Sequence, residues 1–239
     1  MKIWLIPFVF ASIISVGIEC NAQNQPDLYS RKQLKKVEIP IDKTGDTDLF
    51  YNLYGRYRQK IGLKDLIKSN DSFHFRFWHE NEVVDIWTTD NKAFHGVYAD
   101  FTTNDFEHFF NLPLKNIFCD TIILDSTTST YIYDKCCNLS IFSIPKQDSI
   151  KGWANGDDGE EFAIECSTPT YYYFRTYWTP SEFKKKIKEA AELVSLNTIL
   201  TKRLDMEQRW NTFLSGLPNG HYRVGEMLIV DIRKSMPVK

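Results

Sequence analysis

Five histidines and one carboxylate-rich loop are the residues best suited to metal or acid–base chemistry in this chain of 239 residues. His79 and Glu80 match the start of the zinc motif H-E-x-x-H, but Val83 stands where the second histidine would have to be. Residues 157–161 hold four carboxylates, yet they lack the alternating oxygen ligands and the fixed glycine of a calcium loop. These patterns predict no metal site and no cofactor.

A second set of polar residues falls on one face of a predicted strand. Phenylalanines occupy one face of this strand, whereas His74, Arg76 and Trp78 occupy the other. Together with Asp85 of the next predicted strand, His74 and Arg76 are expected to share a face and to form a small charged site. A strand face exposed to solvent gives the same pattern, so both interpretations stay open.

A hydrolase is one alternative for the function. Its site would be assembled across the sheet from Glu165, Asp158 and either His74 or His95. The chain contains no G-x-S-x-G nucleophile motif, and no cysteine stands in a known catalytic signature. The sequence therefore favours a non-catalytic protein over an enzyme.

Residues 171–178 form the most distinctive segment, because six of its eight side chains are aromatic. As a strand, the segment presents three tyrosines and one arginine on a single face. Tyrosine and arginine are enriched in binding surfaces, but a face covered by helices would have the same composition. The candidate binding residues are Tyr171, Tyr173, Arg175 and Tyr177 of this strand, with His74 and Arg76 of the earlier one.

The first residues have the pattern of a signal peptide. A basic start is followed by an apolar run at residues 3–18, which is shorter than the about 20 residues that span a membrane. Small residues then precede Gln23. We predict a signal peptide at residues 1–22 and a periplasmic or secreted protein, with a retained membrane anchor as the alternative. The rest of the chain has no second apolar run of spanning length.

Four cysteines remain once the signal peptide is removed. An even number of cysteines in an exported chain permits two disulfides, although cysteines are also common as reduced core residues. A bond between adjacent cysteines is sterically awkward, so pairing with a distant cysteine is expected. The disulfide candidates are Cys119, Cys136, Cys137 and Cys166.

Composition and charge limit the class of protein. Hydrophobic residues make up 43% and charged residues 25%, which is typical of a globular protein. The aromatic content of 15% favours sheet. A net charge of −2 gives no basic surface for nucleic acid.

Periodicity predicts an α+β fold, in which an antiparallel β-sheet meander of six to eight strands is packed by C-terminal helices. The chain divides into a flexible lead-in at residues 23–45 and a single domain at residues 46–239. A helix is expected within residues 46–61, although Gly55 weakens it. Strands are expected at the following ranges: 73–78, 83–88, 94–102, 118–124, 139–144, 162–166, 171–178 and 222–232.

The clearest local signal for a helix start is a capping box. Thr179 and Glu182 flank Pro180 in the order that caps a helix N-terminus and places proline in its first turn. Apolar residues at helical spacing then predict one helix from residue 180 to about 194 and a second over residues 198–214.

The chain also resembles a group of uncharacterised secreted bacterial proteins. The resemblance lies in residues 156–165, where an Asp-Gly turn leads into a strand ending in Glu165, and in Tyr173 and residues 177–180, where an aromatic strand ends in Trp-x-Pro before a helix. It covers residues 72–193. It implies export and a shared fold, and it carries no known activity.

The leading hypothesis is a non-catalytic exported protein that binds a protein partner in the cell envelope, as an inhibitor or immunity protein does. The hydrolase is the second hypothesis. The third is a structural envelope protein, which would be favoured if the aromatic faces are fully packed.

Overall fold

The computed structural model describes residues 34–41, 45–104, 116–156, 158–225 and 228–233. The predicted signal peptide lies outside these residues. The described residues belong to one compact unit, Leu34–Lys239. Within them, no helix has the length and apolar character needed to cross a membrane.

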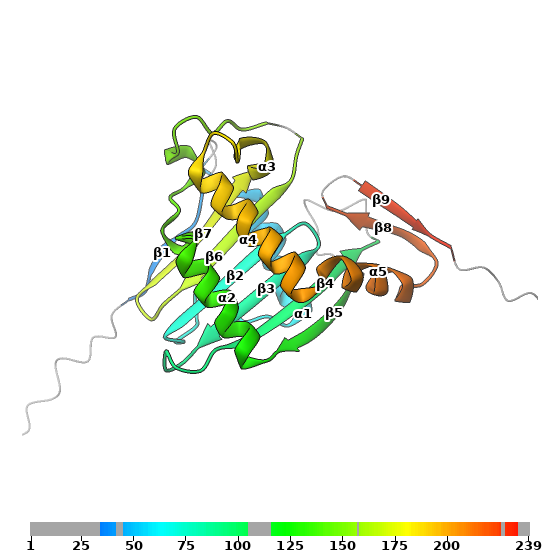
Figure 1. Ribbon diagram of the computed structural model, residues 1–239. Helices are drawn as coiled ribbons and strands as arrows, with labels where there is room; N and C mark the ends of the chain where they lie inside the picture. Colours follow the sequence, from blue (N-terminus) through cyan, green and yellow to red (C-terminus); the bar gives the residue numbers. More distant parts are fainter. Residues whose placement is uncertain (1–33, 42–44, 105–115, 157, 226–227, 234–239) are drawn as a thin grey trace, which may run out of the picture. The chain divides into compact units, whose positions relative to one another are not determined.

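Seven strands form the main sheet, in the order β1-β7-β6-β2-β3-β4-β5, and two more form a separate hairpin (Figure 1). The strands are β1 (Lys36–Glu38), β2 (Phe73–His79), β3 (Glu82–Thr88), β4 (His95–Thr103), β5 (Ile117–Leu124), β6 (Glu161–Ser167), β7 (Tyr171–Trp178), β8 (Gly220–Val224) and β9 (Leu228–Ile232). All neighbours in the main sheet are antiparallel except β1 and β7, which are parallel. The coarse α+β prediction is confirmed, but the sheet is mixed and not purely antiparallel.

Helices cover both faces of this sheet. They are α1 (Leu49–Ile61), α2 (Ser126–Asn138), α3 (Pro180–Phe183), α4 (Lys188–Leu204) and α5 (Met206–Gly216). Side chains of α1 pack against Trp78 and Phe101 on one face. On the opposite face, α2 and α4 lie side by side across the strands (Figure 1) and cover Phe75 and Phe77.

The prediction that C-terminal helices pack the sheet is therefore incomplete: α1 lies where a helix was expected within residues 46–61, and α2 was not expected. Helix α1 precedes the main run of strands, and α2 lies between β5 and β6. The physical reason is that the central strands carry large apolar side chains on both faces, as Phe77 and Trp78 show. Each face then needs a layer of helices to remove it from water.

The segment around α2 also differs from expectation. Asp125 caps α2, because its carboxylate accepts a hydrogen bond from the Thr128 backbone N–H at 2.7 Å. The strand expected at residues 139–144 is a short 3₁₀ turn, η1 (Ile141–Ser143), which follows Ser140 in the left-handed conformation. A second such turn, η2 (Gln147–Ser149), lies shortly after it.

The predicted capping box at Thr179 is wrong. Thr179 has a φ of 45°, and its side chain makes no capping hydrogen bond. The carboxylate of Glu160 instead accepts a hydrogen bond from the Ser181 N–H at 3.2 Å. Glu160, which directly precedes β6, thus satisfies a backbone donor at the start of α3. Helix α3 ends after four residues, α4 begins at Lys188, and the break between α4 and α5 lies at Asp205.

A short part of the expected lead-in, Lys36–Glu38, belongs to the sheet. Strand β1 lies within residues 23–45 and pairs with β7. Next to it, the Lys35 ammonium donates to the carbonyls of Leu66 and Ser69 and to the Ser167 hydroxyl, at 2.6 to 3.0 Å. These bonds fasten this stretch of chain to the sheet.

None of the four cysteines forms a disulfide in the structure. Cys136 and Cys137 are neighbours on α2, so their side chains point about 100° apart, and only Cys136 is buried. Cys166 is buried in the same core as Cys136, and Cys119 is exposed on β5. All four are free thiols.

Candidate functional site

The predicted charged residues do share one face of the sheet, but that face is buried beneath α1 and the stretch of chain that follows it. His74 Nε2 lies 2.5 Å from an Asp85 oxygen, and Arg76 Nη2 donates to the other oxygen at 2.8 Å. The Arg76 side chain is 0% exposed and the Asp85 side chain 3%. Neither a solvent-exposed strand face nor an open charged site is formed.

Glu165 extends this cluster onto β6. One of its oxygens accepts bonds from Arg76 at 3.2 Å and from the Trp78 indole at 2.7 Å. The other accepts a bond from the Tyr172 hydroxyl at 2.9 Å. Burial by itself would raise the pKa of Asp85, but Arg76 and His74 hold that pKa at about 2. The Asp85 carboxylate therefore stays charged and paired.

The other end of the cluster reaches Asp71 and Lys64. His74 Nδ1 lies 2.9 Å from Asp71, and the Lys64 ammonium donates to the same carboxylate at 2.8 Å. Burial opposes ionisation of Asp71, and hydrogen bonds from Lys64, Ser69 and His74 outweigh it and lower its pKa. Every charged member thus has a charged partner, as a buried structural network requires.

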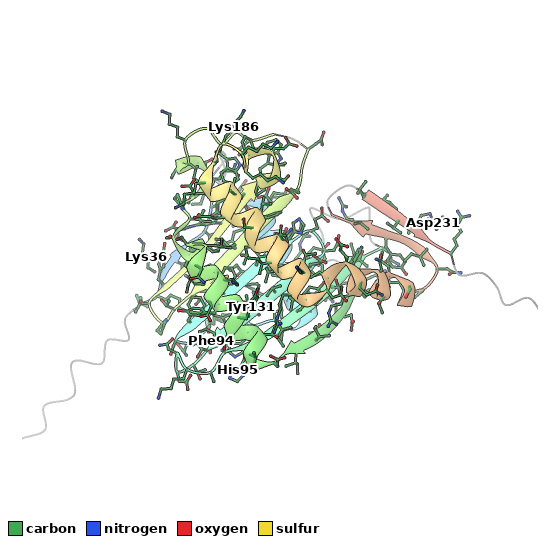
Figure 2. All side chains as sticks on the ribbon, in the orientation of Figure 1. Lys36, Phe94, His95, Tyr131, Lys186 and Asp231 are labelled. Carbon is green, nitrogen blue, oxygen red and sulfur yellow. The ribbon has the colours of Figure 1, made fainter. Side chains whose placement is uncertain are left out.

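The residues of the hydrolase alternative do not meet in one site. Glu165 and His74 are members of the buried cluster. His95 is exposed in the same cross-strand row as His74, and the Trp87 ring lies between the two histidines. Figure 2 shows His95 at the lower end of the sheet. Asp158 is exposed in the loop before β6, at the end of that strand far from the His74 row.

The best-formed hollow beside a predicted binding residue is a groove along the outer edge of β7. Its volume is about 360 Å³. Its lining comes from β7, the start of α1, the stretch after β1, and the segments around η2 and residue 155. The lining residues are Pro40, Ile41, Asp48, Phe50, Lys146, Gln147, Asp148, Asn155, Gly156, Glu161, Arg175, Thr176 and Trp178. We call this hollow the β7 groove. No residue of the buried charged cluster lines it.

Of the predicted binding residues, only Arg175 reaches the β7 groove. Its guanidinium donates to the Ile144 carbonyl, lies 4.0 Å from the Tyr173 ring centre, and lies 3.8 Å from Glu38. Tyr173 and Tyr177 are buried in the core, with 4% and 0% of their surface exposed. Tyr171 is half-buried and donates to Glu38 at 2.5 Å. The tyrosine face is thus packed, and it offers no continuous surface to a partner.

Two glycines allow the Asp-Gly loop to lie directly against the Trp-x-Pro sequence at residues 178–180. A Cβ atom on Gly156 would lie 2.2 Å from Cζ2 of Trp178, and one on Gly159 would lie 2.0 Å from the Thr179 hydroxyl oxygen. No side chain fits at such distances. The two halves of the motif are therefore in contact, and they build the end of the β7 groove where Trp178 lies.

A row of titratable residues crosses four strands on the α4 side of the sheet, and sequence reasoning missed it. His79 lies opposite Glu82, Glu82 opposite Asp100, and Asp100 opposite Asp120. The Tyr98 hydroxyl lies 2.5 Å from Asp100 and 3.1 Å from Glu82. Only the strand register aligns these residues, so no local sequence signal could have found the row.

Burial, reinforced by neighbouring carboxylates, raises the pKa of Glu82 to about 7 and that of Asp100 to about 6. Among the described residues, no group of three or more His, Cys, Asp or Glu side chains could hold a metal ion. The raised pKa values mean that Glu82 and Asp100 hold their protons more tightly than ordinary carboxyl groups do.

Searches with the whole chain add no relative to this picture. No protein-family model matches it, and no curated protein matches it either.

Proposed function

We propose that this chain is a non-catalytic exported protein that binds a protein partner, and that the partner occupies the β7 groove. The observation that carries the proposal is the groove itself. It is open to solvent and combines Arg175, Trp178 and Phe50 in its lining. Arginine and aromatic residues are the types that contribute most to binding energy in interfaces.

The placement of the ionisable residues supports binding over catalysis. A catalytic acid or base must reach its substrate, usually in a cleft. His74, Asp85 and Glu165 are instead buried and already paired with partners inside the protein. An inhibitor or immunity protein needs only a complementary surface, and the β7 groove provides one.

A structural role in the cell envelope is the second candidate. The packed state of Tyr173 and Tyr177 favours it, because the tyrosine face then serves the core alone. This candidate predicts that no partner depends on the β7 groove.

Capture of a partner from envelope extract of the source cell separates the two candidates. The bait is residues 23–239, beside a Lys146→Gln variant in the groove and a Lys184→Gln control at an exposed site outside it. Binding of one stoichiometric partner, lost in the groove variant and kept in the control, supports the proposal. A partner that binds both variants equally would contradict the proposed site, and no partner at all would favour the structural role.

A further inference from the structure

We propose that the partner binds as an extended polypeptide segment, which continues the line of β1 along the open edge of β7. This inference rests on the proposed function and specifies its binding mode. The occupant is a strand with an apolar side chain directed at Phe50 and Trp178.

The open edge exists because β1 stops early, and the sequence contains the reason. The Lys36 N–H donates to the Thr170 carbonyl at 2.8 Å, and the parallel ladder ends at Glu38 opposite Tyr173. Donors of such a strand recur at every second residue. The next donor after Glu38 would be residue 40, which would face the Phe174 carbonyl. Residue 40 is Pro40, which has no N–H to donate.

Further along β7, one residue presents its main chain to the groove. The Thr179 N–H donates to the Glu160 carbonyl. The main-chain N–H and C=O groups of odd-numbered β7 residues therefore point toward β6, and those of even-numbered residues point toward the open edge. Both main-chain groups of Trp178 already have hydrogen-bond partners. Its N–H donates to the Gln147 side chain at 2.5 Å, and its carbonyl accepts from the Trp153 indole at 2.8 Å. The N–H and carbonyl of Thr176, which point to this side, make no hydrogen bond to another described residue.

The edge therefore offers two acceptors, the carbonyls of Phe174 and Thr176, and one donor, the Thr176 N–H. These are the groups that pair when an extended peptide adds to a sheet. The residue of that peptide beside Thr176 would point to the α1 face, where Phe50 and Trp178 both line the groove. The groove thus fits a polypeptide strand that presents an apolar side chain at this position.

The test uses a defined probe, a panel of capped pentapeptides that alternate threonine with valine, leucine, phenylalanine or tyrosine. Amide-proton NMR follows the Thr176 N–H of the protein spanning residues 23–239 at about 1 mM peptide. At least one peptide is expected to slow exchange of this amide about tenfold. The same peptide with N-methylated backbone nitrogens is expected to have no effect. Failure of every peptide to protect the Thr176 amide would overturn the inference.

Two substitutions separate the binding mode from the proposed function. Pro40→Ala restores a donor at position 40, so β1 is expected to extend and to weaken peptide binding about fivefold, the worth of one hydrogen bond. Thr176→Pro removes the edge donor, and Thr176→Ala is its matched control.

The natural partner shows which proposal fails. Loss of its capture by Thr176→Pro but not by Thr176→Ala would support strand addition. If capture depends on Lys146 but survives Thr176→Pro in a folded protein, strand addition is overturned and the β7 groove keeps its role. If neither substitution affects capture, both proposals fail.

Discussion

Arg76 joins the buried charges of two neighbouring strands. It is fully buried and binds Asp85 and Glu165 on either side of β2. Its pKa stays well above the ordinary value, because the two carboxylates outweigh the effect of burial. The guanidinium is thus a permanent charge, and the two carboxylates depend on it.

Arg76→Met is therefore expected to destabilise the protein strongly. It leaves two buried carboxylates without their cation, which costs about 3 to 5 kcal/mol in comparable pairs. Urea unfolding measures the change, with Lys60→Met at an exposed position of α1 as the control. A loss no greater than that of the control would show that the cluster does not hold the sheet face together.

Tyr98 links the two carboxyl groups whose pKa values are raised. Its hydroxyl has one proton and lies within hydrogen-bond distance of both Glu82 and Asp100. It can donate to only one of them, so the other bond requires a proton on a carboxyl group. His79 and Glu80 also act on Glu82, and Asp120 and Arg209 act on Asp100.

Stability is expected to fall as pH rises through this pair. The unfolded chain releases the Glu82 proton near the ordinary value of 4.5, and the folded protein releases it at about 7. The folded state therefore binds more protons between these values, and the free energy of unfolding decreases with pH across that window. Glu82→Gln is expected to remove much of this slope.

At about pH 8, Glu82→Gln is expected to raise the free energy of unfolding by about 2 kcal/mol, because the buried charge is gone. At about pH 5 it should change little. Urea unfolding at both pH values measures this, and Glu207→Gln on α5 serves as the control. An equal effect of Glu82→Gln at both pH values would contradict the raised pKa.

The loop before β6 and the end of β7 pack together as one unit. Gly156 packs on the Trp178 ring, and the Trp153 indole bonds to the Trp178 carbonyl. The loop therefore needs glycine for its close approach to the ring. It shapes the end of the β7 groove that Trp178 lines.

Gly156→Ala is expected to destabilise the protein by about 2 kcal/mol, because a methyl group cannot fit beside Trp178. Gly55→Ala makes a sharp contrast. Gly55 lies inside α1, and apart from its chain neighbours and the backbone of its own helix no atom lies within 4 Å of the place that a Cβ would take there, so alanine is expected to stabilise by about 0.5 to 1 kcal/mol. Thermal unfolding of both variants measures the difference, and equal effects would contradict the loop packing.

The four free thiols mean that the packed core, and not disulfide bonds, stabilises this fold. Burial raises the pKa of Cys136 and brings that of Cys166 to about 12, which makes both thiols unreactive. Cys119 and Cys137 are exposed. The core, with helices on both faces of the sheet, is expected to suffice without covalent links.

The protein spanning residues 23–239 is expected to react with a thiol reagent at two cysteines when folded and at four when unfolded. A reducing agent should leave its unfolding midpoint unchanged. Protein isolated under oxidising conditions with fewer than four reactive thiols after unfolding would show that a disulfide forms.

Several features were predictable from the sequence because they depend on neighbours in the chain. The alternation in β2 and β7 and the i, i+4 spacing in α1 gave their type and approximate bounds. Helix α2 was missed because its sequence is rich in serine, threonine and cysteine, which are weak helix formers, and its helical bonds are supported by packing against β4 and α4. The capping box failed because Thr179 is held at positive φ.

Neighbouring residues in the chain were enough to predict the type of α1, β2 and β7 and the shared polar face of His74 and Arg76. Three findings depend on how the chain packs: this face is buried, Arg175 alone of the β7 candidates borders a groove, and β1 stops beside an open edge. The physical reason is range. Propensity and periodicity act between residues close in sequence, whereas register, layering and burial depend on pairs far apart in the chain.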